Sequence, residues 1–383
     1  IDAFGPDYLA AEMLPRFDLT PWIGRLVGYA ETTRNCIFHC SFCSLTGEGR
    51  KYIKYPLDYI RKQIVAAGQK KILVFLDNNF YGNDQKYFQA RLNLIADLRQ
   101  QGLFEGWAAL VANDFFLKSD NLRLARQTGC LSLFTGLETF DMAWLRRYHK
   151  DQNTIIPPLD LIRSCHEAGL IFSYGMMLDP FTRTLSDLRR ELKFLINAVD
   201  IPLPHYLSIP VPFPGTPFFY DCVAQKAILP LTKLRDLDST TITLRPLDLL
   251  SDVAAFVKEI QSPPGIRQHA IRHCDWFLRR YGSKLNYNQI LIILGSAAHF
   301  LNYLGATAPK SLLLSGKYQR TYVSTTDFLD DTYTPVIPVS ARYACYFKPA
   351  MLTDRQGNLT DDMQELWESR PSSPENVPLA NLN

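Results

Sequence analysis

The feature that most constrains the fold of this sequence is a regular alternation of short apolar runs with helical patterns from Leu26 onward. The runs are rich in β-branched and other apolar residues, which predicts strands at 27–33, 72–77, 107–112, 131–136, 171–177 and 205–211. Several helical segments begin at Pro or Asp and end near Gly, and we predict helices at 56–68, 84–101, 119–128, 141–147, 157–168 and 185–198. This alternation indicates an α/β fold with a parallel sheet. Six right-handed units make an open, partial (βα)6 TIM-like barrel, whose site lies at the C-terminal ends of the strands.

Three cysteines follow the first predicted strand. Cys36, Cys40 and Cys43 stand in a CxxxCxxC spacing, in a chain of 383 residues that has eight cysteines. Tetrahedral zinc needs a fourth ligand, usually from a second Cys or His pair, and the sequence contains no second CxxC. Three thiolates can instead hold a [4Fe–4S] cluster and leave one iron open to another ligand. The alternative is a set of reduced, buried cysteines or a disulfide.

At these cysteines the sequence resembles the radical S-adenosylmethionine (SAM) superfamily. In that family the open iron binds the amino and carboxylate groups of SAM, and an electron from the cluster cleaves SAM to a 5′-deoxyadenosyl radical that abstracts hydrogen from a substrate. The resemblance implies that Cys36, Cys40 and Cys43 are the cluster ligands and that Phe42 packs on the adenine. It also implies anaerobic chemistry and an electron donor such as flavodoxin or ferredoxin.

The segment after the second strand points to one branch of the family. Asp77-Asn78-Asn79-Phe80 is similar to the Phe-x-Asp-Asp/Asn-x-Phe pattern of the cobalamin-associated branch, which includes the anaerobic magnesium-protoporphyrin ester cyclase, bacteriochlorophyllide-modifying enzymes and hopanoid methylases. The resemblance implies that Asp77, with Asn78 beside it, binds the SAM ammonium. A solvated Asp-Asn-Asn turn is the alternative interpretation.

The ends of the third and fourth strands carry further polar residues. Asn113, or Asp114 next to it, is placed to reach a ribose or methionyl group. Gly136-Leu137-Glu138-Thr139 resembles the Gly-Ile-Glu-Ser/Thr of the family, which implies that Glu138 accepts hydrogen bonds from SAM; a surface carboxylate is the alternative. The run Leu145 to Asn153 is similar to a Leu-x-x-x-x-Lys-x-x-Asn pattern of the same branch.

The last two strands match the family less closely. Gly175 lies in the fifth strand, where the family has a glycine-led strand that contacts the cofactor, but Asp179-Pro180-Phe181-Thr182 replaces the usual Phe-Pro-Gly-Glu-Thr ending. Residues 210–217 resemble the Pro-x-Pro-Gly-Thr of the branch. Because prolines leave few backbone donors, a rigid turn over the barrel mouth and a direct ligand contact are both open.

The chain is divided by these patterns into four parts. We expect a lead-in or linker at 1–25, the barrel at 26–240, a helical, aromatic-rich domain that covers the substrate at 241–350, and a tail at 351–383. Helices are predicted at 247–261, 266–281 and 287–304. His269 and His273 have the spacing of a metal pair, but without a third ligand we interpret them as ordinary histidines.

Charge and hydropathy exclude some classes of protein. The net charge is +3, from 41 basic and 38 acidic residues, without a basic run that would track phosphates, so no nucleic-acid partner is expected. No apolar stretch reaches the length of a membrane span, and no signal peptide is recognisable. We therefore expect a cytoplasmic enzyme that acts on a small molecule.

The predicted aromatic cover suits a bulky, mostly apolar substrate. We expect an oxidoreductase of bacteriochlorophyll biosynthesis that hydroxylates or oxidises an alkyl carbon of a (bacterio)chlorophyllide-type tetrapyrrole, with Tyr174, Phe213 and Tyr343 as candidate substrate contacts and no catalytic residue identified. The alternative is a cobalamin-dependent C-methyltransferase of a natural product or isoprenoid. Its cobalamin domain would be missing or in trans, because the sequence has no Asp-x-His-x-x-Gly signature. A non-catalytic iron–sulfur or zinc protein is a third hypothesis.

Overall fold

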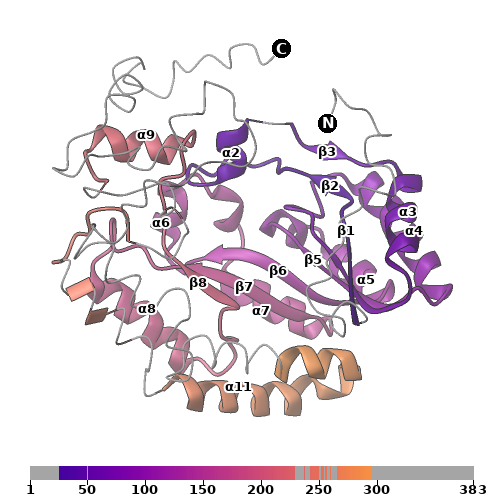
Figure 1. Ribbon diagram of the computed structural model, residues 1–383. Helices are drawn as coiled ribbons and strands as arrows, with labels where there is room; N and C mark the ends of the chain where they lie inside the picture. Colours follow the sequence, from indigo (N-terminus) through magenta and orange to yellow (C-terminus); the bar gives the residue numbers. More distant parts are fainter. Residues whose placement is uncertain are drawn as a thin grey trace, which may run out of the picture.

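Six parallel strands form a curved sheet that is open on one side (Figure 1). The computed structural model describes residues 26–49, 51–228, 237, 242–249, 252–253, 255–256, 259 and 265–294. The strands pair in the order β1 (Val27–Ala30), β4 (Lys70–Phe75), β5 (Phe104–Leu110), β6 (Cys130–Glu138), β7 (Ile171–Met177), β8 (Tyr206–Ser208). This is the predicted partial (βα)6 barrel.

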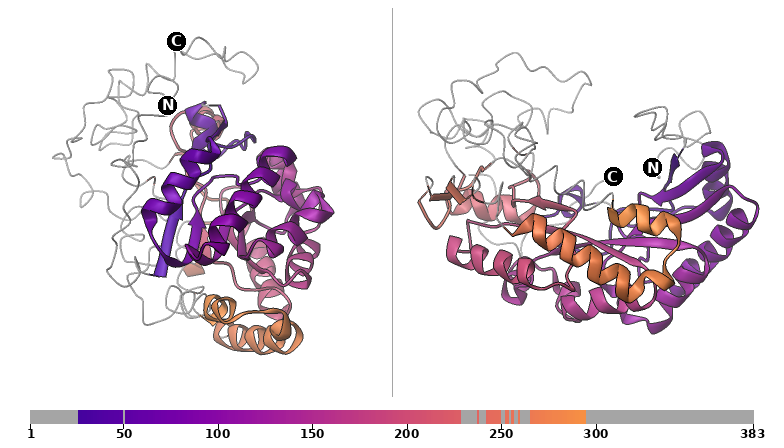
Figure 2. Two further views of the ribbon diagram at one scale, coloured as in Figure 1. Left: turned by 90° about the vertical axis from the view of Figure 1, so that its right-hand side faces the viewer. Right: turned by 90° about the horizontal axis from the view of Figure 1, so that it is seen from below.

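Helices connect the strands, and most of them cover the convex face of the sheet, whereas the one at Met142–Arg147 lies toward the upper edge of the barrel (Figures 1 and 2). They are α3 (Leu57–Ala67), α4 (Gln85–Gln100), α5 (Ser119–Gln127), α6 (Met142–Arg147), α7 (Pro158–Glu167) and α8 (Leu185–Asn197). Their ends follow from local sequence: the side chain of Asp84 caps α4, and Thr184 with Asp187 forms a capping box at α8. Gly68 ends α3 at a positive φ of 71°.

Shorter elements lie between the strands and helices. They are the antiparallel pair β2 (Thr33–Arg34) and β3 (Ile53–Lys54), the helices α2 (Ser44–Glu48) and α9 (Pro217–Ala224), and the 3-10 turns η3 (Asn113–Leu117), η4 (Asp151–Asn153) and η6 (Gly282–Lys284). The strands β2 and β3, with α2 and α9, lie at the upper edge of the barrel in Figure 1. This is the edge at which the barrel strands end.

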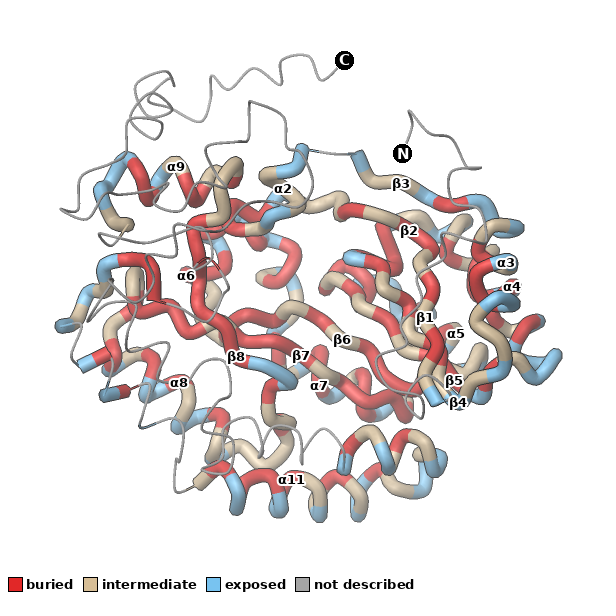
Figure 3. The backbone as a smooth tube through the Cα atoms, viewed as in Figure 1, coloured by how far each residue is buried: buried red, intermediate tan, exposed pale blue. Residues whose placement is uncertain are grey.

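The two faces of the sheet differ in burial (Figure 3). Residues that face the helices form the core, for example Trp107, Leu133 and Tyr174, which are 0–1% exposed. The register places their neighbours on the concave face, where Val74 pairs with Ala108 and Phe134 with Ser173. These concave residues are only partly buried. Because successive side chains of a strand alternate between its faces, the half-exposed set lines the interior of the barrel.

The helix α11 (Ile266–Tyr281) matches the prediction of a helix at 266–281, but it does not lie at the barrel mouth. Its His269 ring contacts the carbonyl oxygens of Ile196 and Ile201, at 2.9 and 3.0 Å. The Gln289 amide donates to the carbonyls of Leu131 and Gly169, near the points where β6 and β7 begin. Residues 265–294 therefore pack at the N-terminal ends of the strands, and this part of the predicted covering domain does not cover the mouth.

Other predicted segments fall outside the described residues. These are the lead-in 1–25, seven of the fifteen residues of the predicted helix 247–261, residues 295–350 of the predicted covering domain with Tyr343, and the tail 351–383. The boundaries of the four parts stay predictions. Among the residues that the structure describes, no helix has the length and apolar character needed to cross a bilayer.

Candidate cofactor site

The three cysteines of the motif lie on one loop between β2 and α2, at the C-terminal edge of the barrel. The loop is closed by local bonds: the N–H of Cys43 donates to the carbonyl of Cys40 at 3.1 Å, and the Thr46 hydroxyl donates to the same carbonyl at 2.9 Å. Cys43 caps the short helix α2. The loop is thus a compact turn that presents three thiols from adjacent positions.

Two distant segments hold this loop in place. The backbone N–H of Ser41 donates to the carbonyl of Tyr148 at 3.0 Å, and the N–H of Phe218 donates to the carbonyl of Ser41 at 3.1 Å. A Cβ at Gly47 would lie 3.1 Å from the backbone of Gly215, so the turn before α9 packs directly on the cysteine loop. Of the two interpretations of this proline-rich turn, these contacts support the structural one.

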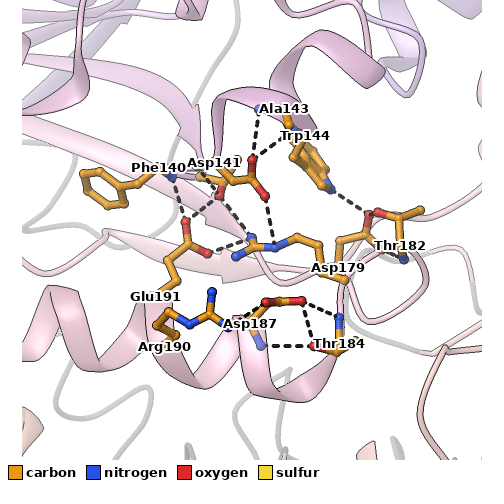
Figure 4. A network of polar contacts seen from close by, with 12 residues as sticks. Phe140, Asp141, Ala143, Trp144, Asp179, Thr182, Thr184, Asp187, Arg190 and Glu191 are labelled. Atoms are coloured by element: carbon orange, nitrogen blue, oxygen red, sulfur yellow. Dashed lines mark hydrogen bonds and ion pairs between the residues drawn. The ribbon is translucent and has the colours of Figure 1, made fainter.

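The aromatic residue of the motif is part of a buried cluster. Phe42 is 8% exposed, and its ring centroid lies 5.8 Å from those of both Trp144 and Tyr148. Asp179 accepts a hydrogen bond from the Trp144 indole at 2.7 Å (Figure 4) and another from the Tyr148 hydroxyl at 2.9 Å. The segment that departs from the family pattern therefore supports the cysteine loop. The predicted packing of Phe42 on adenine stays a prediction.

All seven described cysteines are free thiols, which excludes a disulfide among them. Burial is the main cause that raises the pKa of the Cys36 thiol to about 11; a backbone hydrogen bond at Phe38 opposes this shift, and the neighbouring thiols Cys40 and Cys43 add to it. Within the described part of the chain, no three His, Cys, Asp or Glu side chains converge as ligands of a single ion. Zinc requires such convergence, whereas the thiolates of a cubane bind different irons and do not meet at one point.

An ion pair lies at the end of β6, next to the thiols. Lys150 is 8% exposed and pairs with Glu138, which is 7% exposed and has a positive φ of 68°. A Cβ at Gly136 would lie 2.4 Å from the Glu138 carboxylate, so the glycine makes room for the pair. The Lys150 ammonium also lies 5.6 Å from the centroid of the Phe42 ring. Glu138, Lys150 and Phe42 thus form one group around the cysteine loop.

Several buried polar atoms near this edge have no hydrogen-bond partner among the described residues. They belong to Asn79 after β4, to Asn113 and Asp114 after β5, and to Asn153 of η4. Both carboxylate oxygens of Asp114 are in this set, and its charge acts on Cys36. Unpartnered buried polar atoms are costly, so a group of them at one edge indicates a place for a polar ligand.

Residues 30–195 match the family described as the radical SAM superfamily. This part of the chain is a radical SAM domain. The chain is 26% identical over 194 residues to a hopanoid C-2 methylase of Rhodopseudomonas palustris. This alignment covers 50% of this chain and 37% of that protein. The chain is 25% identical over 194 residues to a bacteriochlorophyllide d C-12(1)-methyltransferase of Chlorobaculum tepidum, with 49% and 41% covered. The chain thus spans about two fifths of the length of these relatives.

Solved structures of radical SAM enzymes are also similar. The methyltransferase TsrM of Kitasatospora setae, with cobalamin and a [4Fe–4S] cluster bound, aligns with a TM-score of 0.45 and 16% identity over 58% of this chain and 41% of TsrM. The cobalamin-dependent enzyme OxsB, with aqua-cobalamin and SAM bound, aligns with a TM-score of 0.46 and 14% identity over 72% and 54%. The names of the curated relatives fit the cobalamin-associated branch.

The radical SAM family implies a [4Fe–4S] cluster and SAM as cofactors. The cysteine loop fits a cubane held by three thiolates, since it offers three free thiols from one turn whose charges act on one another. The unpartnered oxygens of Asp114 and the Glu138–Lys150 pair fit the charged ends of the methionyl group of SAM. The ligand roles of the three cysteines stay predictions that this geometry supports.

The two residues predicted to bind the SAM ammonium differ in position within the radical SAM domain. Asp77 is 0% exposed and accepts hydrogen bonds from the N–H of Thr32 at 3.1 Å and from the hydroxyls of Thr32 and Thr33 at 2.6 and 2.5 Å. The buried guanidinium of Arg91 lies 3.9 Å away. These contacts join the ends of β1 and β4, and they lend the predicted ammonium contact of Asp77 no support. Asn78, by contrast, is exposed.

The predicted contacts on β7 are also occupied by protein groups. A Cβ at Gly175 would lie 2.7 Å from the ring of Tyr206, so that ring fills the space over the glycine where a cofactor contact was predicted. Tyr174 is fully buried on the helix side of the sheet, and its hydroxyl donates to the carbonyl of Pro202 at 2.7 Å. Phe213 packs against the cluster around Phe219. The predicted substrate contacts of Tyr174 and Phe213 gain no support from these positions.

Tyr206, a half-exposed residue of the barrel interior, was not predicted from the sequence as part of the site. Tyr206 is 41% exposed, and its ring stacks on Phe134 with centroids 5.6 Å apart and an angle of 17° between the planes. The charges of Glu138 and Lys150 both act on the Tyr206 hydroxyl, which places this ring near the pair. The pairing of Gly175 with Tyr206 in neighbouring strands was the only signal, and it requires the register to be known.

Proposed function

We propose that this chain is the radical SAM part of a cobalamin-dependent C-methyltransferase of a bulky, mostly apolar small molecule. The observation that carries the radical chemistry is the loop of three free thiols beside a buried ion pair and unpartnered polar groups. The curated relatives named above act as methylases, which favours methyl transfer over the expected hydroxylation or oxidation.

In this proposal the cysteine loop binds the cluster, and polar residues at the C-terminal ends of the strands orient SAM. Cys36, Cys40 and Cys43 hold the cluster, which, when bound, supplies the electron that cleaves SAM. Lys150 and Glu138 face the methionyl carboxylate and ammonium as a paired charge, since buried charges require a counter-charge. Asn78, Asn113 and Asp114 are the remaining polar groups available to SAM at the rim.

The substrate class follows from the concave face of the sheet. The register places apolar and aromatic side chains there from five strands, namely Val27, Tyr29, Ile72, Val74, Ala108, Leu110, Phe134 and Met177. Such a wall binds a ligand chiefly by burial of apolar area and by stacking. Tetrapyrroles of the chlorophyllide type come first among such substrates and isoprenoids second, in agreement with the substrates in the names of the relatives.

Cobalamin would come from outside this sequence. No Asp-x-His-x-x-Gly string occurs in the 383 residues. We therefore propose that a separate chain or a further segment supplies the cobalamin. A soluble donor such as flavodoxin or ferredoxin and a cytoplasmic location complete the proposal.

The deciding experiment uses anaerobically reconstituted protein, a strong reductant, cobalamin and SAM that carries a CD3 group. We expect 5′-deoxyadenosine together with a product of a tetrapyrrole or isoprenoid acceptor that is heavier by one labelled methyl group, as detected by mass spectrometry. A product that gains oxygen and no label would favour the oxidation hypothesis. Iron-loaded protein that releases no 5′-deoxyadenosine would support the non-catalytic hypothesis.

A further inference from the structure

The turn η4 brings one amide side chain to a thiol of the cysteine loop. The side-chain nitrogen of Gln152 lies 3.4 Å from Sγ of Cys40, within the range of a hydrogen bond to sulfur. Gln152 and Cys40 are each 8% exposed, and 112 positions separate them in the sequence. A contact between two buried side chains so far apart in sequence is a property of the folded site.

The position of Gln152 is fixed on both sides. Asn153 donates from its side chain to the carbonyls of Gly136 and Leu137 at 2.7 and 3.3 Å, which ties η4 to the end of β6. On the other side, Lys150 is held by its ion pair with Glu138. Residues before and after Gln152 are thus anchored to the same strand end. The turn η4 therefore presents the Gln152 amide to Cys40.

Two groups near Cys40 counter the effect of burial on its sulfur. Burial raises the pKa of the Cys40 thiol, and the charge of Lys150 and the hydrogen bond from Gln152 act in the opposite direction. Lys150 acts on this sulfur through its charge, and Gln152 acts through a hydrogen bond. A donor that points at a ligand sulfur stabilises the electron-rich state of the group that the sulfur binds.

We propose that Gln152 is a positioning residue that raises the reduction potential of the cluster by donating an N–H···S hydrogen bond to the Cys40 thiolate. The inference rests on the proposed function, in which Cys40 is a cluster ligand. Reduction adds one electron to the cluster and therefore increases negative charge on the thiolates. A preformed donor lowers the free energy of the reduced state more than that of the oxidised state.

The choice of side chain at this position agrees with the role. A leucine of similar size would keep the packing but would offer no donor to sulfur. A glutamate would keep the shape and place a negative charge beside a thiolate, which opposes reduction. The amide combines a neutral charge with a donor that reaches the sulfur.

The test is a potentiometric titration of the reconstituted protein without SAM, followed by the electron paramagnetic resonance signal of the reduced cluster. We expect Gln152→Leu to shift the midpoint potential to a more negative value with the iron content unchanged, and Gln152→Glu to shift it further. The control is Gln89→Leu, because Gln89 is partly exposed on α4 and its amide donates to the side chain of Asn93. It should leave the potential unchanged.

A second readout reports the hydrogen bond itself. In wild-type protein we expect electron–nuclear double resonance to show an exchangeable proton coupled to the cluster, which disappears in deuterated water and is absent from Gln152→Leu. An unchanged potential and an unchanged proton signal in this variant would overturn the inference. Loss of iron from both variants would also overturn it, since Gln152 would then serve to retain the cluster. Wild-type protein that binds no iron would instead refute the proposed function.

Discussion

The indole nitrogen of Trp144 donates to a carboxylate oxygen of Asp179 at a distance of 2.7 Å, inside the protein and next to the cysteine loop (Figure 4). Asp179 is 0% exposed and accepts four further hydrogen bonds, from Tyr148, Phe181 and Thr182. Because Trp144 and Tyr148 both contact the Phe42 ring, this carboxylate links the end of β7 to the loop that carries the thiols. Asp179 thus fixes Trp144 and Tyr148, against which the cysteine loop packs.

Asp179→Asn should therefore weaken the fold and the cysteine loop together. The amide keeps the shape but replaces one acceptor by a donor that faces other donors, and a buried unsatisfied group costs about 1–3 kcal/mol. We expect a lower unfolding midpoint in urea and faster loss of iron from reconstituted protein. Asp160→Asn is the matched control, since the Asp160 side chain is 60% exposed. Equal stability of the two variants would contradict the supporting role of Asp179.

The three cysteines of the motif should be individually essential for iron binding. Cys36→Ala, Cys40→Ala and Cys43→Ala each remove one of three thiolates, so we expect iron content and SAM cleavage to fall to background in all three. Cys222→Ala is the control, because Cys222 is a buried free thiol of α9 outside the motif. Iron and acid-labile sulfide analysis measures the effect. Four irons retained in the Cys40→Ala protein would refute the assignment.

Asp77 should matter for stability more than for SAM binding. Asp77→Ala leaves Arg91 buried without its counter-charge, and breaking a buried pair in this way costs about 3–5 kcal/mol. The free energy of unfolding in urea measures this loss. Asp120→Ala, whose side chain is 69% exposed, should change stability by less than about 0.5 kcal/mol. An Asp77→Ala protein that is as stable as wild type but binds SAM more weakly would instead support the ammonium contact predicted from the sequence.

Asp114 should make the cluster-free protein less stable as the pH rises. Burial raises the pKa of Asp114 from 3.8 to about 7. Between pH 4 and 7 the Asp114 carboxyl is protonated in the folded state and ionised in the unfolded state. Because the folded state binds more protons in this window, the free energy of unfolding falls as the pH rises through it. Asp114→Asn should flatten this dependence.

The pH dependence is measured by urea denaturation of the apo protein at a series of pH values, with Asp120→Asn as the exposed control. A steeper loss of stability in Asp114→Asn than in wild type would contradict the assignment. A separate readout concerns ligand binding: if the unpartnered carboxylate faces a cationic group of SAM, Asp114→Asn should bind SAM more weakly once the cluster is present. The first measurement reports the effect of the buried carboxyl on stability, and the second reports its effect on SAM binding.

The sequence was sufficient for the barrel because periodicity and caps are local. All six strands and the helices between them lie within a few residues of their predicted positions, and helix 266–281 was predicted with the correct ends. The motif cysteines were identifiable because their spacing is itself local. What sequence could not show is which face of a strand a residue takes, as with Tyr174 and Asp77, because burial depends on neighbours that are distant in the chain.

The contact of Gln152 with Cys40 and the position of residues 265–294 were missed for the same reason. Both depend on the folding of one segment against another more than a hundred positions away. An aromatic-rich helix can cover either end of a barrel equally well as far as its own pattern is concerned. Only the carbonyls that it contacts, those of Ile196, Ile201 and Val199, show which end it takes.

Tyr206 should control how substrate binds in the barrel without controlling SAM cleavage. Its ring stacks on Phe134, lies over Gly175 and is 41% exposed, so it forms part of the wall and not part of the core. Tyr206→Ala removes a stacking surface worth about 0.5–1.5 kcal/mol, and we expect substrate affinity to fall roughly threefold to tenfold. Release of 5′-deoxyadenosine without substrate should stay as in wild type. Tyr206→Phe, which keeps the ring, should restore affinity, and a variant that lost SAM cleavage instead would place Tyr206 in the cofactor site.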